Sequence, residues 1–131
     1  MNRLSFLKRI STGFFALFIP QNAKGDVNKK RYFLTKFYVA GFYYYDGETV
    51  VNKLKVGDEL LIVQEPTNPY DRRALEIFTT NNIKLGYVPR NENPIPSRLL
   101  RQNVTIIGTV DKINPDEEDW KKVRINLFAE V

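Results

Sequence analysis

"ALEIFTTNNIKLGYVP", residues 74 to 89, places two runs of strand length on either side of a pair of asparagines. Both runs contain β-branched and aromatic residues, which favour extended backbone. Asn81 and Asn82 tolerate the left-handed conformation that tight hairpin turns require. This stretch therefore predicts an antiparallel β-hairpin.

The segments outside this hairpin also carry a β pattern. "RYFLTKFYVAGFYYY", residues 31–45, is too aromatic and too alternating for a helix, and Gly41 marks a bend or bulge in the expected strand. Turn residues separate this strand from those that follow it. The further strands are expected within residues 54–65, 104–113 and 121–131.

The break in the β pattern is "NPIPSRLLRQ", residues 93–102, which predicts a short helix that starts near Pro96 or Ser97. The expected fold class is therefore mainly β, with six strands and one or two short helices. Short, evenly spaced antiparallel strands in so small a chain favour a partly closed barrel over a sandwich, because closure covers the exposed edges.

Length and composition restrict the chemistry. A chain of 131 residues fits one domain. It contains no cysteine and no histidine, which excludes disulfides, zinc fingers and Cys–His or Ser–His nucleophile pairs. Any catalysis would rest on carboxylates, lysine or tyrosine, with at most an oxygen-ligated metal. An enzyme is the weakest of the interpretations, and we expect no metal and no cofactor. The lack of cysteine also fits a reducing compartment, and we expect a cytoplasmic location.

The net charge of +5 is unevenly distributed along the chain. Residues 1–40 contain eight of the 20 basic residues and one of the 15 acidic residues, a net charge of +7, so residues 41–131 carry −2. Coating a nucleic-acid backbone needs many cations along one groove. The body of the chain is not uniformly cationic, so we do not expect it to coat a polyanion in this general way.

Residues 1–31 form a basic and apolar arm that precedes the expected domain at 32–131. The apolar stretch "GFFALFI" is too short to cross a membrane and marginal for a secretory signal. The favoured interpretation is an amphipathic helix that docks on the body or on a second copy of the chain. The alternatives are contact with a membrane surface and a cleaved signal. Cleavage would overturn the expected cytoplasmic location. The apolar face would consist of Leu4, Leu7, Phe14, Phe15, Leu17 and Phe18.

A stiffened turn, "EPTNPYDRRAL" at residues 65–75, interrupts the strands. Its two prolines fix their own φ and push the residue before each toward extended backbone, so the segment is held in place. The turn sets an aromatic ring, Tyr70, beside a carboxylate, Asp71. Asn68 and Asp71 could instead serve only as Asx-turns, and Tyr70 could be a half-buried ring at the barrel end.

These residue types suit a single-stranded nucleic acid. Aromatic rings stack on bases, worth roughly 1–3 kcal/mol per base. Ionised Asp71, with an ordinary pKa of about 3.9, only accepts hydrogen bonds, so it favours a sugar hydroxyl and repels a terminal phosphate. The candidate stacking residues are Tyr44, Tyr70, Tyr87 and Trp120. The candidate phosphate contacts are Arg72, Arg73, Arg90, Arg98 and Arg101, of which Arg90 is favoured. The alternative for each arginine is a solvated surface position without a binding role.

Two other patterns give only weak indications of function. "NPDEEDWKK", residues 114–122, could offer carboxylates to Mg²⁺ or Ca²⁺, but it lacks the ligand spacing and the glycine of an EF-hand loop, so a solvated loop between strands is expected. Glu65 and Asp71 could be imagined as an acid–base pair, yet nothing in the sequence raises either pKa or brings a nucleophile near.

Three blocks of the sequence resemble the HIRAN domain family. They are "FYVAGFYYYDG" at 37–47, "LKVGDELLIVQEPTNPYDRRAL" at 54–75 and "KLGYVPR" at 84–90, in that order and at that spacing. The resemblance covers about residues 33 to 131, and its Glu-Pro-x-Asn-Pro-Tyr-Asp block is the most specific part. The family includes free-standing bacterial proteins and the N-terminal domains of eukaryotic fork-remodelling ATPases.

The resemblance implies a modified six-stranded OB-like barrel that captures the 3′ end of single-stranded DNA, in repair or fork processing with repair or remodelling enzymes as partners. Its pocket residues carry over to Tyr70 and Asp71, with Asn68 beside them, to Tyr44 in the first strand, and to Arg90. The rival expectation is a protein-interaction or membrane-peripheral module that binds no nucleic acid.

The chain departs from the eukaryotic pattern at two positions. Tyr87 stands where that version has histidine, which removes a possible phosphate donor and adds a ring. Tyr43 stands where it has arginine, which removes a phosphate contact. The departure at Tyr43 matters more and predicts a lower affinity than in the eukaryotic version.

Overall fold

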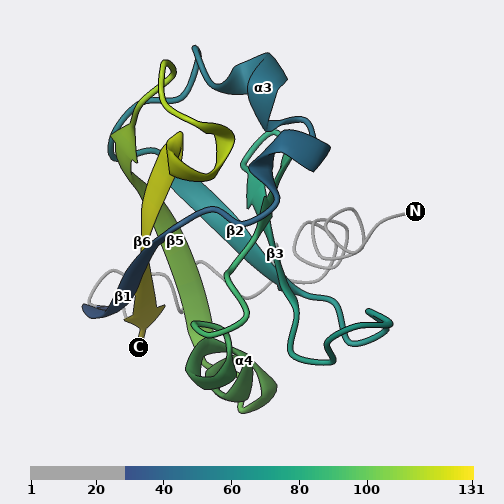
Figure 1. Ribbon diagram of the computed structural model, residues 1–131. Helices are drawn as coiled ribbons and strands as arrows, with labels where there is room; N and C mark the ends of the chain where they lie inside the picture. Colours follow the sequence, from purple (N-terminus) through teal and green to yellow (C-terminus); the bar gives the residue numbers. More distant parts are fainter. Residues whose placement is uncertain (1–28) are drawn as a thin grey trace. The chain divides into compact units, whose positions relative to one another are not determined.

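The computed structural model describes residues 29–131, so the helix expected in the N-terminal arm lies outside the described residues. Six antiparallel strands form one sheet in the order β1-β6-β5-β2-β3-β4. In Figure 1, β5 lies between β6 and β2. The fold class is mainly β, and the single sheet is consistent with an OB-like fold. The strands are β1 (Arg31–Tyr38), β2 (Glu59–Gln64), β3 (Leu75–Thr79), β4 (Lys84–Tyr87), β5 (Thr105–Ile113) and β6 (Val123–Glu130).

The helical elements are short and lie between strands. Two of them, η1 and α3, follow β1, α4 joins β4 to β5, and η2 lies in the loop between β5 and β6. No helix among residues 29–131 is long and apolar enough to cross a bilayer. The bounds are η1 (Phe42–Tyr44), α3 (Gly47–Val50), α4 (Pro94–Arg101) and η2 (Asp119–Lys121).

Alternating residues of the strands build the core. In β6 every second side chain is buried, as expected for a strand with one face on the core. These side chains meet fully buried residues of the predicted hairpin, which stands as β3 and β4. Asn82 has a φ of 71° in the turn between them, the left-handed conformation that the asparagine pair predicted.

The sheet is not closed by a continuous ladder, but one bridge joins the segment after β1 to the far edge strand β4. The amide of Ala40 donates to the carbonyl of Tyr87 at 2.9 Å, and the amide of Tyr87 donates back at 2.8 Å. Gly86, with a φ of +153°, permits this approach, because a Cβ there would lie 2.3 Å from the Ala40 oxygen. The bridge brings the segment that follows β1 beside β4.

Two expected boundaries were wrong. The strand expected over 31–45 ends at Tyr38, because Gly41 adopts a φ of 71° and caps the 3-10 turn η1, so Tyr44 lies in that turn. Helix α4 begins at Pro94, earlier than expected, because proline fits the first turn of a helix, where no amide partner is needed.

Candidate nucleic-acid interface

The turn between β2 and β3 is held by the side chain of Asn68. Its Oδ1 accepts hydrogen bonds from the amides of Tyr70 at 2.8 Å and Asp71 at 3.0 Å, and its Nδ2 donates to Glu65 Oε1 at 2.7 Å. Asp71 Oδ1 in turn accepts from the amide of Arg73 at 2.9 Å. The Asx-turn contacts foreseen for both residues are therefore present, and both polar groups of Asn68 bond within the turn.

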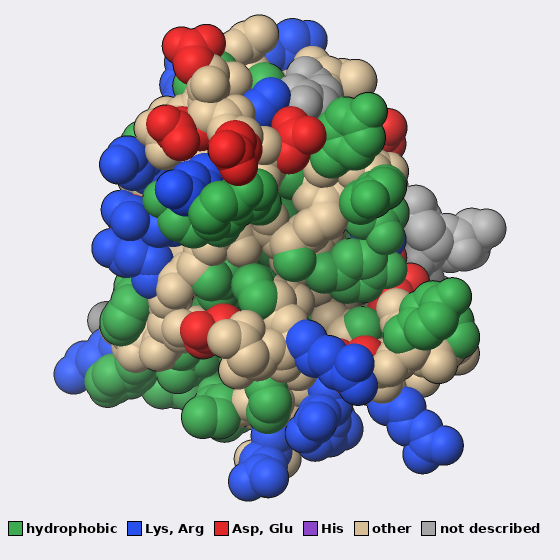
Figure 2. All heavy atoms as spheres, viewed as in Figure 1, with side chains coloured by type: hydrophobic (Ala, Val, Ile, Leu, Met, Phe, Trp, Pro, Cys, Tyr) green, Lys and Arg blue, Asp and Glu red, His purple; other side chains and the backbone are tan. Residues whose placement is uncertain are grey.

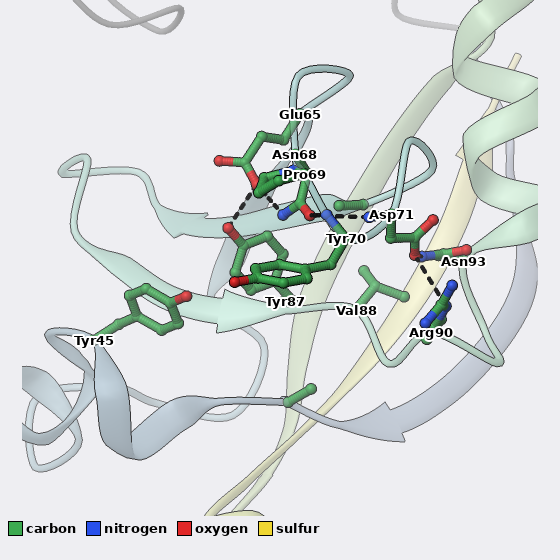
Figure 3. Close-up of a pocket in the computed structure, with 12 residues that line it drawn as sticks. Tyr45, Glu65, Asn68, Pro69, Tyr70, Asp71, Tyr87, Val88, Arg90 and Asn93 are labelled. Atoms are coloured by element: carbon green, nitrogen blue, oxygen red, sulfur yellow. Dashed lines mark hydrogen bonds and ion pairs between the residues drawn. The ribbon is translucent and has the colours of Figure 1, made fainter.

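Tyr70 lies at the tip of this turn and is 84% exposed. The alternative of a half-buried ring at the barrel end is therefore wrong. The ring nevertheless lines a cavity of about 500 Å³, shown in Figure 3, that also involves β4, the segment after it and Tyr45. A ring held at its base by the turn and exposed along its faces can stack on a planar group.

Asp71 is one of two carboxylates that line this cavity, the other being Glu65, and its position is fixed by hydrogen bonds from the protein side. Asn93, which is 1% exposed, donates from Nδ2 to Asp71 Oδ2 at 2.9 Å, and Arg90 Nε lies 3.9 Å from the same oxygen. The hydrogen bond from Asn93, above all, and that from the Arg73 amide hold the pKa of Asp71 below its ordinary value. The group is therefore an ionised acceptor at neutral pH.

Tyr45, Glu65 and Tyr87 line one side of the cavity. Glu76 and Lys84 bond to this side from behind, and we call the network of these five residues the inner wall. The Tyr87 hydroxyl donates to Glu65 Oε1 at 2.6 Å and accepts from Lys84 Nζ at 3.0 Å. Lys84 Nζ also pairs with Glu76 Oε2 at 3.2 Å and lies 4.2 and 4.3 Å from the ring centroids of Tyr45 and Tyr87. Burial, first, and the bond to Glu65 raise the pKa of Tyr87, which keeps its hydroxyl a donor.

The structure gathers most of the predicted site residues into one place. Tyr70 and Asp71 meet in the cavity, and its lining also includes Asn68, Tyr87 and Arg90. In Figure 3 these side chains come from the β2–β3 turn, from β4 and from the segment after β4. Segments distant in sequence thus supply an aromatic ring, a fixed acceptor and an exposed cation to one concave surface.

Tyr44 and Trp120 do not line the cavity. Tyr44 is 81% exposed in η1, and Trp120 is 58% exposed in η2, an element in contact with η1. The Trp120 Nε1 donates to Glu118 Oε2 at 2.6 Å, and Lys121 Nζ lies 4.6 Å from its ring centroid. We call the surface of Tyr44 and Trp120 the aromatic platform; a stacking role there stays a prediction.

Sequence reasoning missed four residues of the site, namely Tyr45, Glu65 as a turn support, Lys84 and Asn93. Tyr45 adjoins Tyr44 in the same aromatic pair, and the end of β1 decides which ring faces the cavity. Asn93 had a signal in the sequence, because asparagine before a proline is typical of a helix N-cap. For Lys84, nothing local distinguishes a buried lysine from a solvated one.

The acidic loop at residues 114–122 connects β5 to β6. Within residues 29–131, no group of three or more acidic side chains is arranged to hold a metal ion. The loop instead contains η2 and carries an ion pair between Lys122 Nζ and Asp119 Oδ1 at 3.3 Å.

The fold and the cavity together define a small OB-like β module with one recessed aromatic and polar site. The HIRAN domain model matches residues 32–131, and the chain belongs to the HIRAN domain family.

Two solved structures are similar to the chain. A crystal structure of a protein from Lactobacillus plantarum is 25% identical, with a TM-score of 0.71 over 79% of this chain and 98% of that one. The crystal structure of the HIRAN domain of human HLTF is 16% identical, with a TM-score of 0.60 over 73% of this chain and 74% of that one, a likeness of fold. No curated protein matches the chain.

Proposed function

We propose that this chain is a non-catalytic module that binds single-stranded DNA by its 3′-hydroxyl end. Membership of the HIRAN family supports a DNA-binding module. The observation that carries the finer proposal is the pairing, on one braced turn, of an exposed ring at Tyr70 with an ionised acceptor at Asp71. Recruitment of repair or remodelling enzymes, and a cytoplasmic location, stay predictions.

Asp71 would distinguish a 3′-hydroxyl from a 3′-phosphate at the end of the strand. Its carboxylate accepts from Asn93 and from the Arg73 amide on the side of the protein, and a carboxylate has about four acceptor positions in all. Acceptor capacity therefore remains for the proton of a terminal hydroxyl. A terminal phosphate would bring negative charge against this carboxylate, so the same group both attracts one end and repels the other.

Tyr70 and Arg90 would hold the rest of the last nucleotides. Tyr70 offers a face to a base, an interaction that tolerates any sequence. Arg90 is 74% exposed beside Asp71, so its guanidinium can turn toward a phosphate between the last nucleotides. Tyr87, with its hydroxyl already bonded to Glu65, would supply a fixed ring edge beneath them.

The experiment is a fluorescence anisotropy titration with ten-nucleotide strands of one sequence that end in a 3′-hydroxyl, end in a 3′-phosphate, or are circular. The wild type should prefer the hydroxyl end. Asp71→Ala should abolish that preference, and Tyr70→Ala should weaken binding of every strand. Thr80→Ala, at an exposed position in the β3–β4 turn, should change nothing. Equal affinity of the wild type for all three strands would overturn the proposal.

A further inference from the structure

Helix α4 begins at an asparagine whose side chain does not cap it. Asn93 is the N-cap residue, and its backbone carbonyl accepts from the amide of Ser97 at 2.9 Å. An N-cap asparagine ordinarily also accepts, through its side-chain oxygen, a hydrogen bond from an amide of the first helical turn. The Asn93 side chain makes no such bond to its own helix. It lines the cavity instead, where its Nδ2 donates to Asp71 Oδ2 at 2.9 Å.

The sequence of the first turn explains why α4 does not need this cap. The side chain of an N-cap residue bonds to the amide of the second or third helical residue. Here these residues are Ile95 and Pro96, and Pro94 precedes them. Proline has no amide hydrogen, so only Ile95 could donate to a capping oxygen. The two prolines therefore release the Asn93 side chain for a contact outside the helix.

The orientation of the Asn93 side chain is set by Asp71 and destabilises the fold. An ionised carboxylate only accepts hydrogen bonds, so the amide nitrogen of Asn93 must face it. The amide oxygen of Asn93 is buried and accepts no hydrogen bond from the residues that the structure describes. A buried acceptor without a partner lowers stability. A polar residue held in this way is typical of a functional site rather than of a core that serves stability alone.

The bond from Asn93 completes the support of the Asp71 carboxylate. Asp71 Oδ1 accepts from the amide of Arg73, and Asp71 Oδ2 accepts from Asn93, both at 2.9 Å. Donors at two different oxygens fix the rotation of the carboxylate group as well as its position. Figure 3 shows Asn93 and Arg90 at this carboxylate, but Arg90 is 74% exposed and its Nε lies 3.9 Å away, too far for a hydrogen bond. Asn93 is therefore the donor that fixes Oδ2.

The charged groups around Asp71 support the same ranking. Arg90 approaches Asp71 from the segment after β4, Arg73 follows it in the turn, and Glu65 is the other carboxylate that lines the cavity. The bond from Asn93 lowers the pKa of Asp71 most, ahead of the Arg73 amide and of the charges of Arg90 and Arg73, whereas burial raises it. The neutral amide of Asn93 thus does more for the ionised form than either exposed arginine.

We propose that Asn93 is a positioning residue for the recognition of the strand end. It holds the Asp71 carboxylate in the orientation that accepts a terminal hydroxyl, and because Asn93 is 1% exposed it acts on the strand only through Asp71. This inference rests on the proposed function and adds a residue that determines its specificity. Loss of Asn93 should therefore lower the discrimination between strand ends and leave the attraction of the rest of the strand unchanged.

The test compares Asn93→Ala with Asn91→Ala, the same substitution at an exposed asparagine of the same segment. Affinity is measured for ten-nucleotide strands that end in a 3′-hydroxyl, end in a 3′-phosphate, or are circular. In Asn93→Ala the preference for the hydroxyl end should fall about tenfold, as for the loss of one hydrogen bond to a charged group. Affinity for the circular strand should stay unchanged, and Asn91→Ala should alter neither quantity. An equal loss for all three strands in Asn93→Ala would show a structural role only and would overturn the inference.

Two further variants separate positioning from folding. Asn93→Ser keeps a residue that is favoured at the N-cap, but its hydroxyl is too short to replace the amide at Asp71, so the preference should fall to the same extent. In the Asp71→Ala background, Asn93→Ala should leave the affinity for the hydroxyl strand within about twofold, since the two residues act through one bond. A loss there as large as in the wild-type background would show that Asn93 acts independently of Asp71 and would overturn the inference.

An NMR titration of the Asp71 carboxyl group tests the role of Asn93 without a ligand. The pKa of Asp71 should rise toward its ordinary value in Asn93→Ala, because the largest influence that lowers it is removed, and it should stay low in Asn91→Ala. The two failures are therefore distinguishable. Equal binding of all three strands by the wild type would overturn the proposed function, while an unchanged pKa of Asp71 in Asn93→Ala would overturn the role of Asn93.

Discussion

The tip of the β2–β3 turn and the inner wall both contain tyrosine and carboxylate side chains, but they differ in exposure and in the range of their hydrogen bonds. Tyr70 at the tip is exposed, and the turn beneath it is fixed by hydrogen bonds between residues at most three apart. Tyr87 in the wall is half-buried, and its hydroxyl bonds across 22 residues to Glu65. The comparison teaches that the groups offered to a ligand are largely separate from those that hold the fold.

The largest effect is expected where the wall meets the bridge. Gly86→Ala places a Cβ 2.3 Å from the Ala40 oxygen at a φ of +153°. Overpacking and backbone strain should together lower the free energy of unfolding by about 3–4 kcal/mol. Urea denaturation measures this, with Gly57→Ala as control, since a Cβ there meets nothing within 4 Å and only its φ of +94° is unfavourable. Equal losses in the two variants would show that the bridge does not constrain the sheet.

The next effect concerns the cation of the wall. Lys84→Met removes an ion pair with Glu76, a carboxylate that is 5% exposed, and the contacts with two rings. Breaking a buried ion pair from one side should destabilise the fold by about 2–4 kcal/mol. Thermal and urea unfolding should show this loss, while Lys53→Met, at an exposed position, should stay within about 0.5 kcal/mol. An unaltered stability of Lys84→Met would remove the distinction between tip and wall.

At the tip the effect should fall on binding alone. Tyr70→Ala should weaken binding of a single strand by about 1–3 kcal/mol, or roughly 5- to 150-fold, through lost stacking. Its free energy of unfolding should change by no more than about 0.5 kcal/mol, because the ring is 84% exposed. Tyr87→Phe is the matched wall variant and should lose about 1 kcal/mol of stability with the bond to Glu65. A stability loss in Tyr70→Ala as large as that would contradict the comparison.

The smallest effect is a dependence on pH. Because the folded-state pKa of Asp71 lies below its unfolded value, its ionisation stabilises the fold above the unfolded pKa, near 3.9, and this contribution is lost as pH falls through the folded pKa. The difference in unfolding free energy between wild type and Asp71→Asn should be constant from pH 8 to 5 and shrink in acid. Denaturation at several pH values measures it; a difference that disappears near pH 6 would show a raised pKa instead.

Local chemistry predicted much of this molecule. Neighbouring residues were enough to predict three features: the turn at the asparagine pair, the alternating C-terminal strands and the braced turn. The structure contains all three. The end of β1 could not be placed, because Gly41 is compatible with a bulge and with the cap of a 3-10 turn. Because Gly41 caps the 3-10 turn, Tyr44 lies outside the expected strand, and Tyr45 is the ring that lines the cavity.

The inner wall could not be predicted for a different reason. Lys84 meets Glu76 across the β3–β4 hairpin and the rings of Tyr45 and Tyr87 from two segments, so its environment depends on the register of β4 and on the bridge at Ala40. Neither the register of β4 nor the bridge can be predicted from the sequence. Asp71 could be identified as an acceptor, but its support by Asn93 required the position of α4.

The most direct test of the account is the affinity of the wild type for two ten-nucleotide strands that differ only at the last sugar, one with a 3′-hydroxyl and one with a 2′,3′-dideoxy terminus. This change removes a hydroxyl without adding charge or bulk. If Asp71 accepts a hydrogen bond from that hydroxyl, the dideoxy strand should bind more weakly by about 1.5–3 kcal/mol, roughly 10- to 150-fold, and Asp71→Asn should reduce the difference. Equal binding of the two strands by the wild type would contradict the account.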